Sequence, residues 1–214
     1  MNDTENNAYA QDILRAFEPG KVWFTSDTHF HHANIIRYCN RPFKDVEQMD
    51  ATLIRRWNET VPHDGIVFHL GDFAMGGSAE WSNLLDRLNG QIFLILGNHD
   101  MKCIRQGFMG RFSHVTQQMA IRVGGQPIVL NHNPFLCYGG AYRDVWQLFG
   151  HVHSGPLSGK GKEVDSSNGK DLPRLSMLFP RQYDVGVDNN DFRPVSFAEV
   201  KRKIEAQVEK ATEQ

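Results

Sequence analysis

The chain has 214 residues, of which 40% are hydrophobic, so it can form one substantial core, and we expect a single domain over residues 1–214. The formal net charge of −2 lacks the basic excess that is usual for a bulk duplex binder, and it does not decide whether nucleic acid is a partner. No apolar run approaches the length of a membrane span, so we expect no membrane partner.

The N-terminus and the cysteines predict a cytoplasmic protein. Residues 1–11 are polar and lack the basic start and apolar stretch of a secretory signal. The cysteines are odd in number and widely scattered, which is typical of free thiols in a reducing compartment, and none has the spacing of a zinc ribbon. They are Cys39, Cys103 and Cys137.

Strand-like and helix-like patterns alternate in the first half of the chain. Residues 22–25, 66–70 and 92–96 are short apolar runs rich in β-branched or aromatic residues, and they predict buried strands. Residues 45–60 and 78–89 carry apolar residues at helical spacing, and a serine suited to the N-cap begins the second segment. Both segments predict amphipathic helices that cover a sheet.

The second half of the chain is richer in strands. From Val115 onward, short apolar runs interrupted by Gly124-Gly125 predict a hairpin. Residues 154–180 predict a flexible loop insertion, because most of this segment is rich in Gly, Ser and Lys. Residues 197–210 are charged and have a helical pattern. Further strands are expected at residues 128–130, at residues 146–149 and around Val185.

Each of five apolar runs is followed by polar residues suited to binding a metal. In an open sheet with helices on its faces, ligands gather beyond the carboxyl ends of the strands, so residues placed there can converge in space. The sequence therefore predicts one site built from several strand ends. The residues concerned are Asp27, His29, Asp72, Asn98, His132, His151 and His153.

Carboxylate oxygen and imidazole nitrogen are ligands for a hard or borderline divalent metal, so no cysteine is needed. Asp27 and His29 lie one residue apart and can point at one ion after a turn of the chain. The carboxylate of Asp72 follows a glycine that allows close backbone approach, and it can bridge two cations. His151 and His153 lie on the same side of an extended segment, so two metals could share them.

The segment Gly97-Asn98-His99-Asp100 offers three different polar groups in succession. Asn98 supplies a neutral amide oxygen as a ligand. His99 supplies an imidazole, and the Asp100 carboxylate can orient that ring and raise its basicity.

At these residues the chain resembles the calcineurin-like metallophosphoesterase superfamily. The pattern of that superfamily runs Asp-x-His, Gly-Asp, Gly-Asn-His-Asp/Glu, His and Gly-His-x-His, and every block is present here in order between residues 22 and 153. Further segments resemble small single-domain bacterial and phage members. They are Ser26–Phe30, Asn40–Phe43, His69–Phe73 and Asp184–Val195.

The resemblance implies an α/β fold in which a two-layer mixed β-sandwich is flanked by helices, and it implies two divalent metal ions at a binuclear site. Manganese is the expected metal, and iron and zinc are also compatible with mixed oxygen and imidazole ligation. In the implied ligand set, one group of residues holds the first ion, a second group holds the second ion, and Asp72 bridges both. The first group is Asp27, His29 and His153, and the second is Asn98, His132 and His151.

The implied activity is metal-dependent hydrolysis of phosphoester bonds by a hydroxide that bridges the two metals. His99 would lie outside the metal shell and protonate or stabilise the leaving oxygen, with Asp100 holding its ring. Because the sequence shows no obvious cap domain, we favour small or flexible phosphodiesters, nucleotides among them, although monoesters also fit. The sequence does not indicate the oligomeric state.

Two alternatives stand beside this hypothesis. A nuclease would use the same chemistry, but it would need a basic groove with stacking aromatic residues, and no clear basic stripe is present. A catalytically silent metal-binding scaffold would typically lack a ligand or the histidine at position 99, whereas here the set is complete.

Several polar residues outside the pattern receive separate interpretations. His32 is a candidate contact for the substrate phosphate, His31 is expected on the surface, and His69 is expected to be a hydrogen-bonded core residue. Arg37 and Arg41 could reach the mouth of the site, but ordinary solvated side chains explain them equally well. Lys160, Lys162, Arg174 and Arg181 could bind phosphate if their loop covers the site, although a solvated loop is the favoured interpretation.

Overall fold

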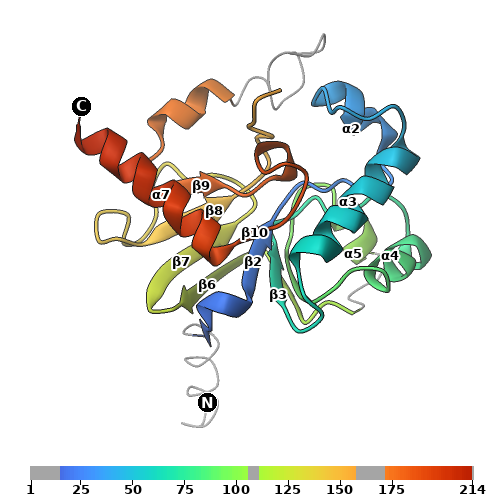
Figure 1. Ribbon diagram of the computed structural model, residues 1–214, viewed down its shortest axis with the longest axis horizontal. Helices are drawn as coiled ribbons and strands as arrows, with labels where there is room; N and C mark the ends of the chain where they lie inside the picture. The colour runs from blue at the N-terminus through green and yellow to red at the C-terminus, as the bar shows by residue number, and fades with distance from the viewer. Residues whose placement is uncertain (1–14, 106–110, 158–171, 214) are drawn as a thin grey trace.

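The computed structural model describes residues 15–105, 111–157 and 172–213, which form two sheets flanked by helices (Figure 1). Each sheet has five strands. Both sheets contain parallel and antiparallel pairs. The mixed two-layer α/β architecture expected from the sequence is therefore confirmed.

The first sheet has the strand order β10-β2-β3-β4-β5. Its strands β2 to β5 are parallel, and only β10 is antiparallel to its neighbour β2. The carboxyl ends of the parallel strands consequently share one edge of the sheet. The strand bounds are β2 Val22–Thr25, β3 Ile66–His69, β4 Gln91–Ile95, β5 His114–Thr116 and β10 Val195–Ser196.

The second sheet has the order β1-β6-β7-β8-β9. Strands β6 and β7 form the expected hairpin, and their turn places Gly124 at φ 56° and Gly125 at φ 87°. Glycine is the residue that adopts such positive φ angles without strain. The strand bounds are β1 Ala16–Phe17, β6 Gln118–Val123, β7 Gln126–Asn131, β8 Trp146–Phe149 and β9 Gln182–Asp184.

The inner faces of the two sheets enclose one hydrophobic core. The register of the first sheet aligns Phe24, Phe68 and Phe93 across β2, β3 and β4. These rings pack in one cluster with Leu130 and Leu148 of the second sheet. All five side chains are almost completely buried, so burial of apolar surface holds the two sheets together.

A second hydrophobic core lies on the other face of the first sheet, under the helices α3 (Val46–Thr60) and α4 (Ser78–Leu85). Val67 and Leu94 point to this face, whereas their neighbours Phe68 and Phe93 point inward, as the alternation of side chains along a strand requires. Strands β3 and β4 are therefore apolar on both faces. This explains why they appear in the sequence as continuous apolar runs.

The predicted helices form, with small differences in length. Helix α3 begins after Asp45, whose side chain accepts a hydrogen bond from the Gln48 N–H group. Helix α4 ends at Leu85 instead of continuing to residue 89, because the next residues form a tighter turn in which Arg87 donates to the Leu84 carbonyl. The short helices are α2 (Ala33–Tyr38) and α5 (Met101–Arg105).

Helix α7 (Phe197–Thr212) extends the predicted segment by two residues and packs against the core between the sheets. Its buried residues Phe197, Val200 and Ile204 recur at helical spacing. In Figure 1 it lies beside β8 and β9, on the opposite side of the molecule from α3 and α4.

Three 3-10 helices lie in the connections, η1 (Pro19–Lys21), η2 (Leu172–Met177) and η3 (Val187–Asn189). Helix η2 falls within residues 154–180, which the sequence predicts to be a loop, so the described end of that segment is ordered as a helix. Residues 158–171, including Lys160 and Lys162, lie outside the described part of the chain.

The first turn of α7 yields a prediction about stability. The Ser196 hydroxyl accepts from the Glu199 N–H group at 3.2 Å, and the Glu199 carboxylate accepts from the Ser196 N–H group at 3.0 Å. Ser196→Ala removes the hydroxyl acceptor and should lower the free energy of unfolding by about 1 kcal/mol, measured by urea denaturation. Ser196→Thr keeps the hydroxyl, and an equal loss in both variants would contradict this explanation.

Candidate metal centre

The residues expected to bind metal follow the carboxyl ends of strands from both sheets. Asp27 and His29 follow β2, Asp72 follows β3, and Asn98 follows β4. In the second sheet, His132 follows β7, whereas His151 and His153 follow β8. The structure brings all of these side chains together where the two sheets meet.

Most of these positions have an unusual backbone conformation. Asp27, His29, Asp72, His151 and His153 have φ angles between 47° and 71°. Non-glycine residues rarely adopt this left-handed region, and each such residue typically costs on the order of 1–3 kcal/mol unless its surroundings hold it there. The backbone is therefore strained at the positions from which these side chains point into the site.

Glycines next to these residues allow the loops to approach one another. A Cβ atom on Gly71 would lie 2.5 Å from the Gly97 nitrogen, and one on Gly97 would lie 2.2 Å from Oδ1 of Asp72. A Cβ atom on Gly150 would lie 2.3 Å from Oδ2 of Asp27. These distances are too short for any side chain. Steric exclusion therefore explains why glycine occupies the first position of the Gly-Asp, Gly-Asn and Gly-His blocks.

The side chains form two adjacent groups of possible ligands. Ligand atoms of Asp27, His29 and His153 lie within 4.8 Å of one another, as do those of Asp72, His132 and His151. Oδ1 of Asn98 lies 3.1 Å from Nε2 of His132 and 3.1 Å from Nδ1 of His151, so Asn98 joins the second group.

Asp72 lies between the two groups. Its Oδ2 atom is 3.5 Å from Nε2 of His29 in the first group and 3.5 Å from Nε2 of His132 in the second. The side chain of Asp72 is only 3% exposed, so water does not compete freely for its oxygens. A buried carboxylate at equal distance from two imidazoles has the geometry needed to bridge two cations.

Two of the histidines, His132 and His29, present nitrogens that fit a bound cation. In His132, Nδ1 donates to the Leu70 carbonyl at 2.7 Å, so this nitrogen carries the proton and Nε2 presents a lone pair to the site. Nε2 of His29 is buried and has no hydrogen-bond partner among the described residues. Burial, followed by the neighbouring cationic groups, holds the pKa of His29 well below its ordinary value, so its lone pair is available.

A buried carboxylate orients His153 from behind. Asp188 of η3 contacts Nδ1 of His153 at 2.7 Å, which leaves Nε2 facing Asp27 at 3.9 Å. Carboxylates commonly orient metal-binding histidines in this way. Burial favours the neutral form of Asp188, but the charges of Arg41 and His153 outweigh it and lower its pKa to about 2.

Arg41 neither lies at the mouth of the site nor is solvated, the two interpretations that the sequence left open, because it is buried behind the site. Its guanidinium donates to both carboxylate oxygens of Asp188, at 2.9 Å and 2.8 Å. It also donates to the backbone carbonyls of Asp27 at 2.6 Å and of Thr28 at 3.0 Å. Arg41 therefore ties the strained loop after β2 to the segment that orients His153. Arg37, by contrast, is exposed on α2.

Sequence reasoning missed Asp184 and Asp188. They belong to a segment identified only by its resemblance to a closing strand and turn, and their partners are far away in the sequence. Oδ2 of Asp184 accepts from the Ser154 N–H group at 3.0 Å and so holds the backbone directly after His153. Burial, followed by the charge of Asp27, raises the pKa of Asp184 to about 7.

Asp100 does not lie where the resemblance placed it. Its fully buried carboxylate accepts from the backbone N–H groups of Asp72, Phe73 and Gly97, at 2.8–2.9 Å. It therefore fixes the loops after β3 and β4 instead of holding the His99 ring. Burial, followed by the charge of Asp72, raises its pKa to about 6.

His99 and His32 border the site on its solvent side. The side chain of His99 is 38% exposed, and its Nε2 lies 3.9 Å from Oδ2 of Asp72. The same 4.8 Å grouping also joins His99 with His29 and Asp72. The His32 ring lies 5.2 Å from that of His29 and 5.7 Å from that of His99. Burial and the charge of His99 lower the pKa of His32 to about 4, so it is neutral near pH 7.

Two other histidines behave as the sequence predicts. His69 is fully buried, where its Nδ1 accepts from the Gly71 N–H group and its Nε2 contacts the Thr28 hydroxyl at 2.9 Å. Burial lowers the pKa of His69 to about 3, and it is a hydrogen-bonded core residue. His31 is exposed and pairs with Asp50 at 2.7 Å.

The fold and the set of candidate ligands are those of a metal-dependent phosphoesterase. Comparison with known proteins agrees with this class. A family model described as calcineurin-like phosphoesterase matches residues 20–180. The chain belongs to the calcineurin-like phosphoesterase family.

Similar proteins occur in archaea and in phages. The chain is 36% identical over 187 residues to an uncharacterized protein of Methanocaldococcus jannaschii, a match that covers 86% of this chain and 92% of the archaeal one. It is 33% identical over 133 residues to the gene 66 protein of Mycobacterium phage L5, covering 54% of this chain and 64% of the phage protein.

A solved structure shares the fold. The crystal structure of a protein of unknown function from Aquifex aeolicus has a TM-score of 0.62 and 22% identity, and the match covers 85% of this chain and 97% of that one.

Within the described ranges, no helix is long and apolar enough to cross a membrane.

The contacts of Arg41 predict a large effect on stability. Arg41→Met would leave the Asp188 carboxylate buried without its cation, and breaking a buried ion pair from one side typically costs about 3–5 kcal/mol. We expect a loss of this size in the free energy of unfolding, measured by urea denaturation. The matched control is Arg37→Met on the exposed face of α2, and a similar loss in both variants would contradict the role of Arg41.

Proposed function

We propose that this protein hydrolyses phosphodiester bonds at a binuclear metal site. The observation that carries the proposal is the position of Asp72, whose Oδ2 lies 3.5 Å from Nε2 of His29 and 3.5 Å from Nε2 of His132. A carboxylate placed in this way can bridge two cations. Membership of the calcineurin-like phosphoesterase family supplies the reaction class, which is metal-dependent hydrolysis of phosphoesters.

In this proposal the two groups of side chains hold one divalent ion each. When bound, two such ions supply a hydroxide nucleophile near neutral pH and neutralise the phosphoryl oxygens. Manganese is the metal that we expect, with iron and zinc as alternatives for the same oxygen and imidazole ligands. The first ion would be held by Asp27, His29 and His153. The second ion would be held by Asn98, His132 and His151, and Asp72 would bind both ions.

We assign to His99 the role of general acid, which donates a proton to the leaving oxygen. The backbone N–H group of His99 donates to Oδ1 of Asp72 at 2.9 Å, which fixes the residue beside the site while its ring stays partly exposed. A general acid in this position is commonly worth about 10²–10⁴ in rate. The neutral His32 ring next to it can donate a hydrogen bond to a phosphoryl oxygen.

Space around the site supports a diester as the substrate. A diester carries a substituent on each side of the phosphorus, so both must find room. His99 is partly exposed on one side of the site, and His151 borders a cavity of about 490 Å³ on another. A small phosphodiester, such as one built on a nucleotide, fits these surroundings.

We also expect a cytoplasmic location, since Cys39 and Cys137 are free thiols.

Substitution of Asp72 and of His99 should separate metal binding from proton transfer. Asp72→Ala should lose both bound metal and turnover of bis-p-nitrophenyl phosphate. His99→Ala should keep the metal but lose about 10²–10⁴ in rate, most strongly for esters with poor leaving groups. Metal content is measured by elemental analysis, and His63→Ala, at an exposed histidine, is the control. Equal metal loss in the His99 and Asp72 variants would make His99 a ligand.

Removal and return of the metal test the class of reaction. Protein stripped by a chelator should lose hydrolysis of bis-p-nitrophenyl phosphate, and added manganese should restore it. Faster hydrolysis of p-nitrophenyl phosphate would instead identify a monoesterase, and preferred cleavage of single-stranded DNA or RNA would identify a nuclease. Two tightly bound metals without hydrolysis of any of these substrates would favour a binding scaffold.

A further inference from the structure

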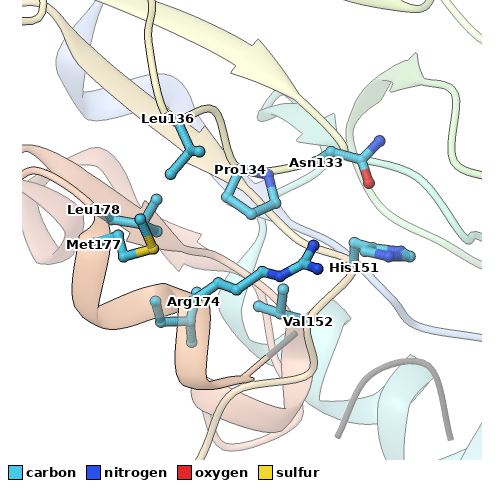
Figure 2. A pocket seen from close by; sticks show the side chains of 9 residues that line it. Asn133, Pro134, Leu136, His151, Val152, Arg174, Met177 and Leu178 are labelled. Atoms are coloured by element: carbon cyan, nitrogen blue, oxygen red, sulfur yellow. The ribbon is translucent and has the colours of Figure 1, made fainter. Parts of the chain in front are cut away.

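A cavity of about 490 Å³ opens beside the candidate metal centre, with His151 in its lining, and the sequence pattern does not predict it (Figure 2). Its walls come from the loop after β7, from the residues after β8, and from η2. The cavity is large enough for a small-molecule substituent of about nucleoside size. Its lining residues include His151, Val152, Pro134, Leu136, Met177 and Leu178.

The cavity is polar at one end and apolar at the other. Figure 2 shows His151 at one end, with Leu136, Met177 and Leu178 grouped at the opposite end. Between them the guanidinium of Arg174 extends from η2 toward His151. A ligand that matches this distribution has an anionic group near His151 and an apolar group beyond it.

The apolar end exposes hydrophobic side chains that the fold does not need for its core. Leu136 is 56% exposed and Met177 is 65% exposed, although most large hydrophobic residues in the described part of the chain are at least partly buried. Adjacent exposed hydrophobic residues commonly mark a ligand-binding groove. Methionine also makes favourable contacts with aromatic rings through its sulfur.

We propose that this cavity, bounded by Leu136, Arg174 and Met177, binds the aromatic part of an ester substituent of the substrate, such as the base of a nucleoside that is esterified through its sugar. The inference rests on the proposed function, because it takes the scissile phosphate to lie at the metal centre. Arg174 then contacts the anionic phosphate end, and the apolar end of the cavity selects the substituent. The segment after β8 thus contributes both metal ligands and substrate selectivity.

Diesters with one common leaving group test the selectivity. The comparison uses p-nitrophenyl methyl phosphate, p-nitrophenyl phenyl phosphate and the p-nitrophenyl ester of thymidine 5′-phosphate, so the scissile bond is the same in all three. We expect kcat/KM to be at least about tenfold higher for the phenyl and thymidine esters than for the methyl ester. Leu136→Ser and Met177→Ser should remove most of this preference by lowering kcat/KM for the phenyl and thymidine esters.

These variants are suitable because their side chains are already largely exposed, so each should fold. Tyr142→Ser is the matched control, since Tyr142 is 88% exposed and does not line the cavity. Arg174→Gln should raise KM for all three esters by a similar factor, because it removes a phosphate contact. Equal kcat/KM values for the three esters in the unmodified protein, or a preference unchanged in both serine variants, would overturn the proposal.

A binding measurement separates this inference from the proposed function. Calorimetric titration of the manganese-loaded protein with phenyl phosphate and with methyl phosphate needs no turnover. Tighter binding of phenyl phosphate that is lost in Met177→Ser supports the cavity even if no diester is hydrolysed, and the failure then belongs to the proposed reaction. Equal affinities for the two ligands in the unmodified protein would contradict the cavity assignment whatever the activity.

Discussion

The close approach of the loops after β3 and β4 is the constraint on which the metal centre depends. A Cβ atom on Gly71 would collide with the backbone of Gly97, and one on Gly97 would collide with Asp72. Asp100 then accepts hydrogen bonds from the backbone of both loops. The position of the Asp72 carboxylate between His29 and His132 follows from this arrangement, because its backbone is held on both sides.

The strained backbone of the site is supported by buried charges. Asp27 and His29 adopt left-handed conformations in the loop after β2, and Arg41 holds that loop through two of its backbone carbonyls. Asp188 pairs with Arg41 and also orients His153. The geometry of the first group therefore depends on side chains that are buried behind it, and such support is typical of preorganised metal sites.

The sequence predicts the strands, the main helices and the convergence of the ligand residues, because hydrophobic periodicity and position after a strand are local signals. It does not predict the role of Arg41, since nothing local marks a pairing with Asp188, 147 residues later in the chain. It also misplaces Asp100, because a carboxylate next to a histidine can equally bind backbone N–H groups of another loop. The sequence does not predict the cavity at Leu136 and Met177 for the same reason, since its walls belong to separate segments.

The two sheets contribute to both ligand groups. Asp27 and His29 follow a strand of the first sheet, whereas His153 follows a strand of the second, and Asn98 and His132 divide in the same way. An ion held by either group is therefore a cross-link between the sheets at the rim of their shared hydrophobic core. Because an ion that binds only the folded chain stabilises it, such a cross-link would add to the cohesion that the buried apolar surface already provides.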